Sequence, residues 1–117
     1  MTHGSQSAVS VYKVELNGAG SSADVVSRSV ARDDSYQKFD ACVVGNAPCH
    51  GHTECDSIIM DRGRILAVPS LEANDVDAEL IHEAAIGKIA GEQLIKLMTL
   101  GLTEAEAEEQ IINGFLK

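Results

Sequence analysis

The sequence predicts a mainly β chain that ends in a helical segment, and three observations support this. From residue 9 to about residue 72, short runs rich in Val and Ile alternate with polar residues, which is typical of strands. Turns containing Gly, Asn, Asp or Pro separate these runs. From about residue 78 to residue 117, apolar residues instead recur at helical spacing.

Length and composition favour one small domain. The chain has 117 residues, of which 44% are hydrophobic, and no run of about 18 apolar residues indicates a transmembrane helix. Residues 1–8 are expected to be a disordered N-terminus, and they lack the apolar core of a signal peptide. We therefore expect a cytoplasmic protein with no membrane association.

The charge of the chain argues against nucleic-acid binding. Eighteen Asp and Glu residues against nine Lys and Arg give a formal net charge of −9, which repels phosphate backbones. Aromatic residues make up 3% of the chain and Trp is absent, so no platform for base stacking is evident. A basic protein partner suits this composition better.

Five strands are predicted, each bounded by turn residues. They cover residues 9–16, 23–30, 39–44, 52–60 and 64–68. The turns lie at residues 17–20, 33–35, 45–48 and 61–63. No helical period lies between the strands, so a βαβ architecture is disfavoured, whereas a sandwich, a barrel and a solenoid all remain open.

Two short helices are predicted after the strands. In the first, Leu94, Leu97 and Met98 recur at helical spacing, and Gly101 follows as a stop. The second begins with a capping box from Thr103 to Glu106 and presents an apolar face. That face consists of Ala107, Ile111 and Phe115. The resulting helical hairpin either packs on the β region, docks a partner, or does both.

The three cysteines, Cys42, Cys49 and Cys55, argue against a disulfide framework because their number is odd in an apparently cytosolic chain. They are either thiols for metal or sulfur chemistry or small buried hydrophobic residues. For Cys42, which precedes Val43 and Val44, we expect a core position.

Residues 49–55 gather several potential metal ligands. On a strand, Cys49, Gly51, Thr53 and Cys55 would share one face, with His50, His52 and Glu54 on the other. Cys49, His50 and His52 are thus weak candidates for metal ligands, because their spacing matches no zinc motif. A simple metal-binding protein using these residues with Cys55 is one possible function. No nucleophile–base–acid triad is evident.

Several motifs, in order, resemble the SufB/SufD family. They are the His-Glu-Ala motif at residues 81–89, the Gly-Glu-Gln-Leu helix start at 91–94, the turn at 101–107, the Asn-Gly-Phe segment at 112–117, and Glu-Cys-Asp-Ser at 54–57. The resemblance implies a parallel, right-handed β-helix, with residues 9–76 as its rungs and residues 77–117 as a C-terminal helical segment of the same SufBD-like domain. Family members are far longer, so a truncated core or an unusually small homologue is expected.

The resemblance also implies a function, that of an iron–sulfur cluster assembly scaffold. It implies that Cys55, His82 and Glu83 bind sulfur or a transient iron–sulfur cluster. It implies partners too: a SufC-type ATPase, and a second copy or a SufB/SufD-like subunit as dimer partner. The ATPase-binding residues would be Glu92, Gln93, Leu97, Gly101, Glu104 and Phe115.

Two further expectations follow. The chain has no Gly-x-x-x-x-Gly-Lys-Ser/Thr loop, so it is not itself expected to be an ATPase or another enzyme. An interaction module that keeps the ATPase-binding hairpin but assembles no cluster is the alternative to the scaffold.

Overall fold

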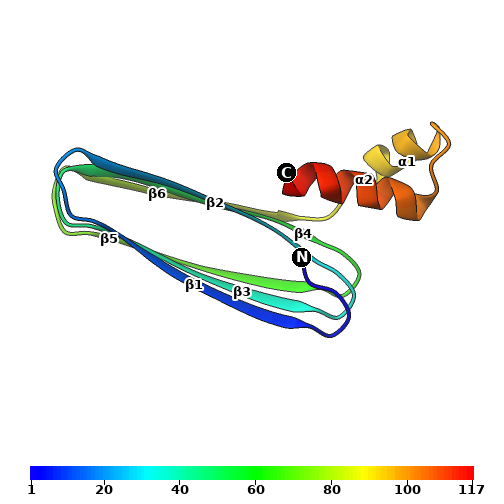
Figure 1. Cartoon of the computed structure of the whole chain (residues 1–117), viewed down its shortest axis with the longest axis horizontal. Coiled ribbons are helices and arrows are strands. Elements are labelled where there is room, and N and C mark those ends of the chain that lie inside the picture. The colour runs from blue at the N-terminus through cyan, green and yellow to red at the C-terminus, as the bar shows by residue number, and fades with distance from the viewer.

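The structure is a computed structural model that describes all 117 residues, as six strands followed by two helices (Figure 1). The strands are β1 (Ser7–Leu16), β2 (Ser21–Ala31), β3 (Tyr36–Gly45), β4 (Cys49–Ile59), β5 (Arg64–Ala73) and β6 (Ala78–Gly87). The helices are α1 (Gly91–Met98) and α2 (Glu104–Leu116). The prediction of a mainly β chain with C-terminal helices is confirmed.

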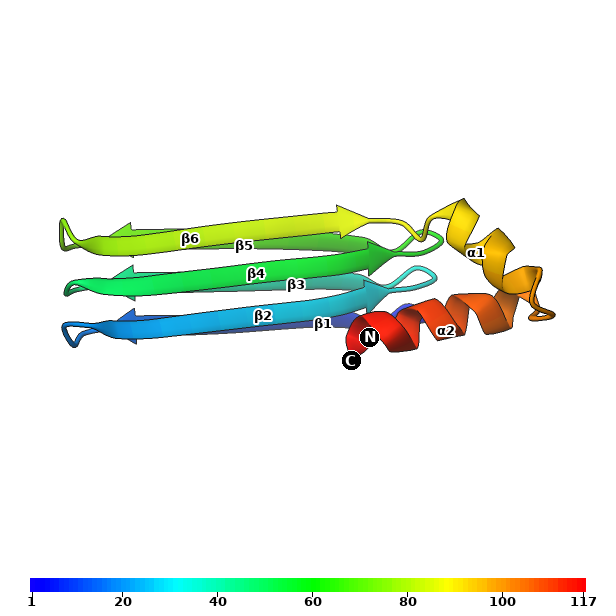
Figure 2. The same ribbon diagram turned by 90° about the horizontal axis from the view of Figure 1, so that it is seen from above.

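The strands form two three-stranded parallel sheets, ordered β1-β3-β5 and β2-β4-β6. Successive strands alternate between the sheets, which lie face to face and are joined by turns at both ends (Figures 1 and 2). Ser21 pairs with Cys49 and Cys49 with Ala78, so the pairing repeats every 28 or 29 residues. The sheets do not close into one tube, and the predicted β-helix therefore stays a prediction.

The turns stack because the same residue types recur at the same place. Asn46 donates from Nδ2 to Asn17 Oδ1, and Asn74 donates in the same way to Asn46, both over 2.7 Å. At the opposite end, Asp33 and Asp61 adopt left-handed φ angles of 56° and 55°, a conformation that Asp tolerates better than most residues. The predicted turns that contain Asn17, Asp33, Asn46 and Asp61 are confirmed, whereas the turn at Asn74 lies outside the predicted set.

The space between the sheets is apolar at the end where β1 terminates. Leu16, Val43 and Cys49 are buried together there, with Leu80 against them. Gly51 faces the same cluster, since a Cβ atom on it would lie 2.9 Å from Leu80 Cδ2. This packing ties the sheets together near the Asn turns.

The boundary between strands and helices differs from the prediction. The helical segment was expected from residue 77, but residues 78–87 form strand β6 and the first helix begins at Gly91. Strand β4 supplies a register partner for every residue from Ala78 to Gly87. Long-range pairing thus overrides the helix propensity of Glu83, Ala84 and Ala85.

The N-terminal residues also contact the sheets. The backbone N–H of Thr2 donates to Val30 O over 3.0 Å, and Thr2 forms an isolated parallel bridge with Ala31. The Thr2 hydroxyl donates to the hydroxyl of buried Ser35. The disorder predicted for residues 1–8 stays a prediction.

Helix α2 packs on the outer face of the β2-β4-β6 sheet. Thr103 caps it, and the predicted capping box with Glu106 is confirmed in both directions. Ile112 is buried against Val30 and Met60, and the Arg28 guanidinium donates to the C-terminal Lys117 carbonyl. Helix α1 has no buried residue, and neither helix is long and apolar enough to cross a membrane.

Candidate functional site

Strand β4 directs alternate side chains to opposite faces of its sheet. Cys49, Thr53 and Cys55 are buried between the sheets, with Cys55 only 1% exposed, whereas His50 and His52 lie on the outer face. This is the division that the sequence predicts for residues 49–55. Strand β4 therefore takes part in two chemically separate environments.

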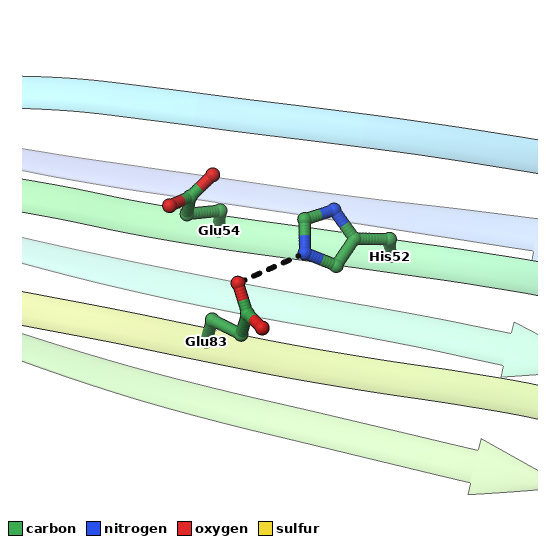
Figure 3. A group of neighbouring side chains, drawn as sticks. All are labelled: His52, Glu54 and Glu83. Carbon is green, nitrogen blue, oxygen red and sulfur yellow. Dashed lines mark hydrogen bonds and ion pairs between the residues drawn. The ribbon is translucent and has the colours of Figure 1, made fainter.

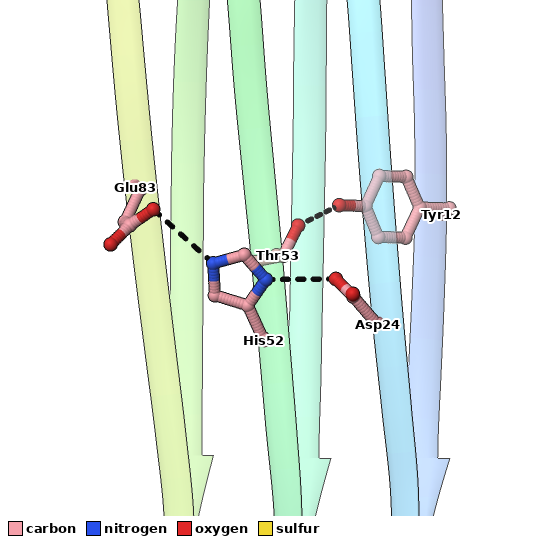
Figure 4. Close-up of polar contacts among 5 residues, drawn as sticks. All are labelled: Tyr12, Asp24, His52, Thr53 and Glu83. Carbon is pink, nitrogen blue, oxygen red and sulfur yellow. Dashed lines mark hydrogen bonds and ion pairs between the residues drawn. The ribbon is translucent and has the colours of Figure 1, made fainter.

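Polar side chains occupy the middle of the space between the sheets. The Tyr12 hydroxyl of β1 hydrogen-bonds the Thr53 hydroxyl of β4, and this bond joins the two sheets (Figure 4). His82 of β6 is the register partner of Thr53 and lies on the same inner face. Both ring nitrogens of His82 are buried without a hydrogen-bond partner. Because buried polar atoms are nearly always paired, this imidazole is a candidate ligand or proton acceptor.

Cys55 lies one step further along the same inner face. It pairs with Ser27 and Ala84, so His82 is its diagonal neighbour on the adjacent strand. Burial raises the pKa of the Cys55 thiol, and the hydrogen bond with Ser57 opposes this effect only in part. The thiol is therefore neutral at pH 7 and becomes a thiolate only when a metal ion or a base takes its proton.

Glu83 lies on the opposite face from Cys55 and His82. Its Oε2 is 3.3 Å from Nε2 of outward-facing His52, whose Nδ1 lies 2.8 Å from Asp24 Oδ1 (Figure 4). Adjacent residues on a strand point to opposite faces, so His82 and Glu83 are separated by the sheet itself. Of the three predicted cluster residues, Cys55 and His82 share the inner face, and Glu83 lies on the outer face.

The outer face of this sheet carries a compact group of possible ligands. One ligand atom each from His52, Glu54 and Glu83 lies within 4.8 Å of the others (Figure 3). Hydrogen bonds to Asp24 and then Glu83 raise the pKa of His52. The charge of Asp56 is the main cause that raises the pKa of Glu54, with Glu83 contributing less.

Glu54 and Asp24 were not among the predicted site residues. The sequence places Glu54 on the same face as His52, but it does not reveal the 28-residue pairing that brings Asp24 alongside. A search for polar residues recurring at that interval would have found Asp24.

The other predicted metal ligands do not come together. Cys49 is buried in the apolar cluster with Leu16 and Val43, while His50 points outward with Nδ1 3.5 Å from Glu79 Oε2. Cys42 lies in the other sheet, paired with Lys13 and Ser70. It is partly exposed, so the expected core position is wrong; the residue beside it, Val43, points inward instead.

Comparison with known proteins places this chain in the family that its sequence motifs resemble. The family described as "SUF system FeS cluster assembly, SufBD core domain" matches residues 1–115. The chain belongs to the SufBD core-domain family. An iron-sulfur cluster assembly SufBD family protein of Methanothermobacter thermautotrophicus is 44% identical over 106 residues, covering 89% of this chain and 26% of that protein.

Further SufBD relatives show the same partial coverage. A protein of the same description from Archaeoglobus fulgidus is 39% identical, over 87% of this chain and 28% of the relative. A SufBD family protein from Pyrococcus horikoshii is 41% identical, over 86% of this chain and 31% of the relative. The chain thus spans about a quarter to a third of the length of these relatives.

The residues predicted to bind an ATPase lie on the C-terminal helices of this SufBD chain. Glu92, Gln93 and Leu97 belong to α1, and Glu104 opens α2. Gly101 lies between the helices with a φ of 98°, which suits glycine. Phe115 lies on α2, where its side chain packs against the buried cluster of Val30, Met60 and Ile112.

Proposed function

We propose that this SufBD chain is part of a scaffold on which iron–sulfur clusters are assembled, and that it is not an enzyme itself. The observation that carries the proposal is the shared inner face of Cys55 and His82, where an imidazole with two unpaired ring nitrogens neighbours a buried thiol. The family match and the relatives described as iron-sulfur cluster assembly proteins support it.

The chemistry of these two side chains suits cluster assembly. A cysteine thiolate is the normal ligand of iron in a cluster, and imidazole also binds iron. The raised pKa of Cys55 means that iron binding is needed to form the thiolate, because ligation of the metal ion releases the thiol proton. His82, the diagonal neighbour of Cys55 on the adjacent strand, would accept that proton or become a second ligand.

The proposal also includes dimerisation through a sheet edge. Strands β5 and β6 end their sheets, so their outer backbone groups are free to pair with another chain. On the inner face of β6, Ala84 and Ile86 are exposed, the latter by 44%. A second copy or a related subunit covering this edge would shield the space beside Cys55 and His82. Further strands at the β1 and β2 edges would extend the fold into the proposed β-helix.

The proposed ATPase partner would bind the helical hairpin. Helix α1 exposes Ile95 by 64% and Met98 by 43%, and Leu100 just after it by 78%. Exposed apolar residues grouped on a short helix are suited to a protein partner. Nucleotide hydrolysis by that partner would then supply the movement that opens the buried thiol.

Anaerobic reconstitution with iron and sulfide tests the scaffold. Cys55→Ala should lower cluster absorption to the background level, whereas Cys42→Ser, which removes a thiol in the other sheet, should leave it unchanged. His82→Ala should also lower it. Far-UV circular dichroism checks that each variant folds. Equal cluster loading in wild type and Cys55→Ala would reject Cys55 as the site.

The burial of Cys55 also favours a second candidate, an interaction module without cluster assembly. Such a module would bind the ATPase through the hairpin and keep its thiols unreactive. Co-purification with a SufC-type ATPase, combined with no cluster in wild type after reconstitution, would favour it over the scaffold.

A further inference from the structure

The outer face of the β2-β4-β6 sheet holds a histidine between carboxylates from three strands. His52 lies at the centre, with Asp24 of β2 on one side and Glu83 of β6 on the other (Figure 4). Glu54 lies two residues along β4 on the same face (Figure 3). None of these four side chains belongs to the inner face that carries Cys55.

The histidine is held in an orientation that suits metal binding. Asp24 Oδ1 lies 2.8 Å from His52 Nδ1 and, when it accepts that N–H, directs Nε2 towards Glu83. A carboxylate that holds one imidazole nitrogen while the other binds the metal is a recurring feature of histidine metal sites. The His52 side chain is 24% exposed, so its ring is partly fixed yet open to an ion from solvent.

The charge of this face also favours a cation. Ligand atoms of Glu54, Glu83 and His52 lie within 4.8 Å of one another, and Asp56 follows two residues after Glu54 on the same face of β4. A cation bound between these carboxylates would offset their mutual repulsion. His52 is the residue in this group that can carry a positive charge, and a metal ion at Nε2 would take the place of its second proton.

We propose that His52 Nε2, Glu54 and Glu83 bind a divalent first-row transition-metal ion, with Asp24 as the positioning residue for His52. One imidazole and two carboxylates form a mixed set suited to Fe²⁺, Mn²⁺, Co²⁺ or Zn²⁺, and exposure leaves coordination positions for water. That the natural ion is Fe²⁺ rests on the proposed function; the site would then receive iron on one face of strands whose other face holds the sulfur ligand.

Cobalt binding to the full chain tests the site, because Co²⁺ reports its ligands by absorption. We expect one Co²⁺ per chain by calorimetry, with d–d bands and without thiolate-to-cobalt charge transfer. His52→Asn and Glu54→Gln should each abolish this binding. Asp24→Asn should weaken it by about 10–100-fold, the usual effect of losing a carboxylate behind a histidine ligand.

A matched control lies on the same face. His50→Asn removes a histidine that faces Glu79 and should leave Co²⁺ affinity unchanged. The substituted residues all lie on the outer face, and circular dichroism confirms that the variants fold. Unchanged affinity in both His52→Asn and Glu54→Gln, or a thiolate band in wild type, would overturn the proposal.

The result of the Co²⁺ binding experiment can be distinguished from the result of the cluster reconstitution experiment. Cys55→Ala should bind Co²⁺ as wild type does, since its side chain lies on the inner face. Loss of cluster assembly with retained Co²⁺ binding therefore concerns Cys55 alone. A wild-type chain that binds Co²⁺ at this site but never forms a cluster would reject the proposed function and leave the metal site standing.

Discussion

The inner and outer faces of strands β4 and β6 differ in burial and in charge. On the inner face Cys55 is 1% exposed and its thiol is kept neutral by burial. On the outer face the His52 side chain is 24% exposed and neighbouring carboxylates favour its charged form. The same backbone therefore holds a protected sulfur and an accessible imidazole, separated only by the alternation of side chains.

This difference changes how neighbouring residues are interpreted. His82 and Glu83 are adjacent in sequence, yet His82 lies beside Thr53 inside and Glu83 beside His52 outside. In a two-sided sheet, residues two apart share a site and residues one apart do not. A motif such as His-Glu-Ala on a strand can thus supply two sites at once.

Among substitutions that compare the stability of the two faces, Gly51→Val on the inner face should lower the free energy of unfolding most. A Cβ atom at residue 51 would lie 3.2 Å from both Leu16 Cδ1 and Val43 Cγ1, in addition to its contact with Leu80. Because inserting side-chain atoms into a packed interior costs about 1–3 kcal/mol, the free energy of unfolding in urea should fall by that amount.

The matched outer-face substitution is His50→Val, one residue earlier on the same strand. Its side chain is 53% exposed, so the change in unfolding free energy should stay within about 0.5 kcal/mol. Similar losses for Gly51→Val and His50→Val would show that the two faces of β4 are not packed differently.

A smaller effect is expected from the hydrogen bond that joins the sheets. Tyr12→Phe or Thr53→Val alone leaves one partly or fully buried hydroxyl unpaired, whereas the double variant removes both. The double-mutant cycle should give a favourable coupling of about 0.5–1.5 kcal/mol, the usual net value of one hydrogen bond. A coupling of zero in urea unfolding would mean that this bond does not stabilise the pairing of the sheets.

Much of this contrast could be predicted from sequence because strand alternation is a local property. The pattern from Cys49 to Cys55 assigned each side chain to its correct face without any knowledge of the fold. The Thr103 capping box was predictable for the same reason, since its partners lie three residues apart. The resemblance to SufB/SufD proteins indicated which residues are candidates for binding a cluster, but it did not indicate the face of the sheet on which each side chain lies.

The register between strands could not be predicted, because it depends on residues 28 or more positions apart. Residues 78–87 were predicted as part of the helical segment, and the grouping of Glu83 with Cys55 rested on the family resemblance, which does not show which face of a strand each residue occupies. Once Thr53 is known to pair with His82, alternation alone separates Glu83 from the inner pair. Long-range pairing is therefore the piece of information that distinguishes one mixed site from two separate ones.

The smallest expected effect is on the pH dependence of stability, which should differ between the outer-face His52 and the inner-face Cys55. On the outer face the folded-state pKa of His52 is raised above 6.5, mainly by the hydrogen bond with Asp24. Its contribution to stability is complete below pH 6.5 and is lost as the pH rises through the raised pKa. On the inner face the Cys55 pKa is raised above 9.0, so this group lowers stability only at pH values above 9.0.

Asp24→Asn removes the hydrogen bond that contributes most to the raised pKa of His52 on the outer face, and it changes no residue of the inner face. The ring-proton NMR titration of His52 should move to lower pH, by more than it does in Glu83→Gln, and unfolding stability should depend less on pH above 6.5. The decline above pH 9.0 should persist, because Cys55 keeps its burial. An unchanged His52 midpoint in Asp24→Asn would show that the row Asp24, His52 and Glu83 is not formed in solution, and the contrast between the two faces would then rest on burial alone.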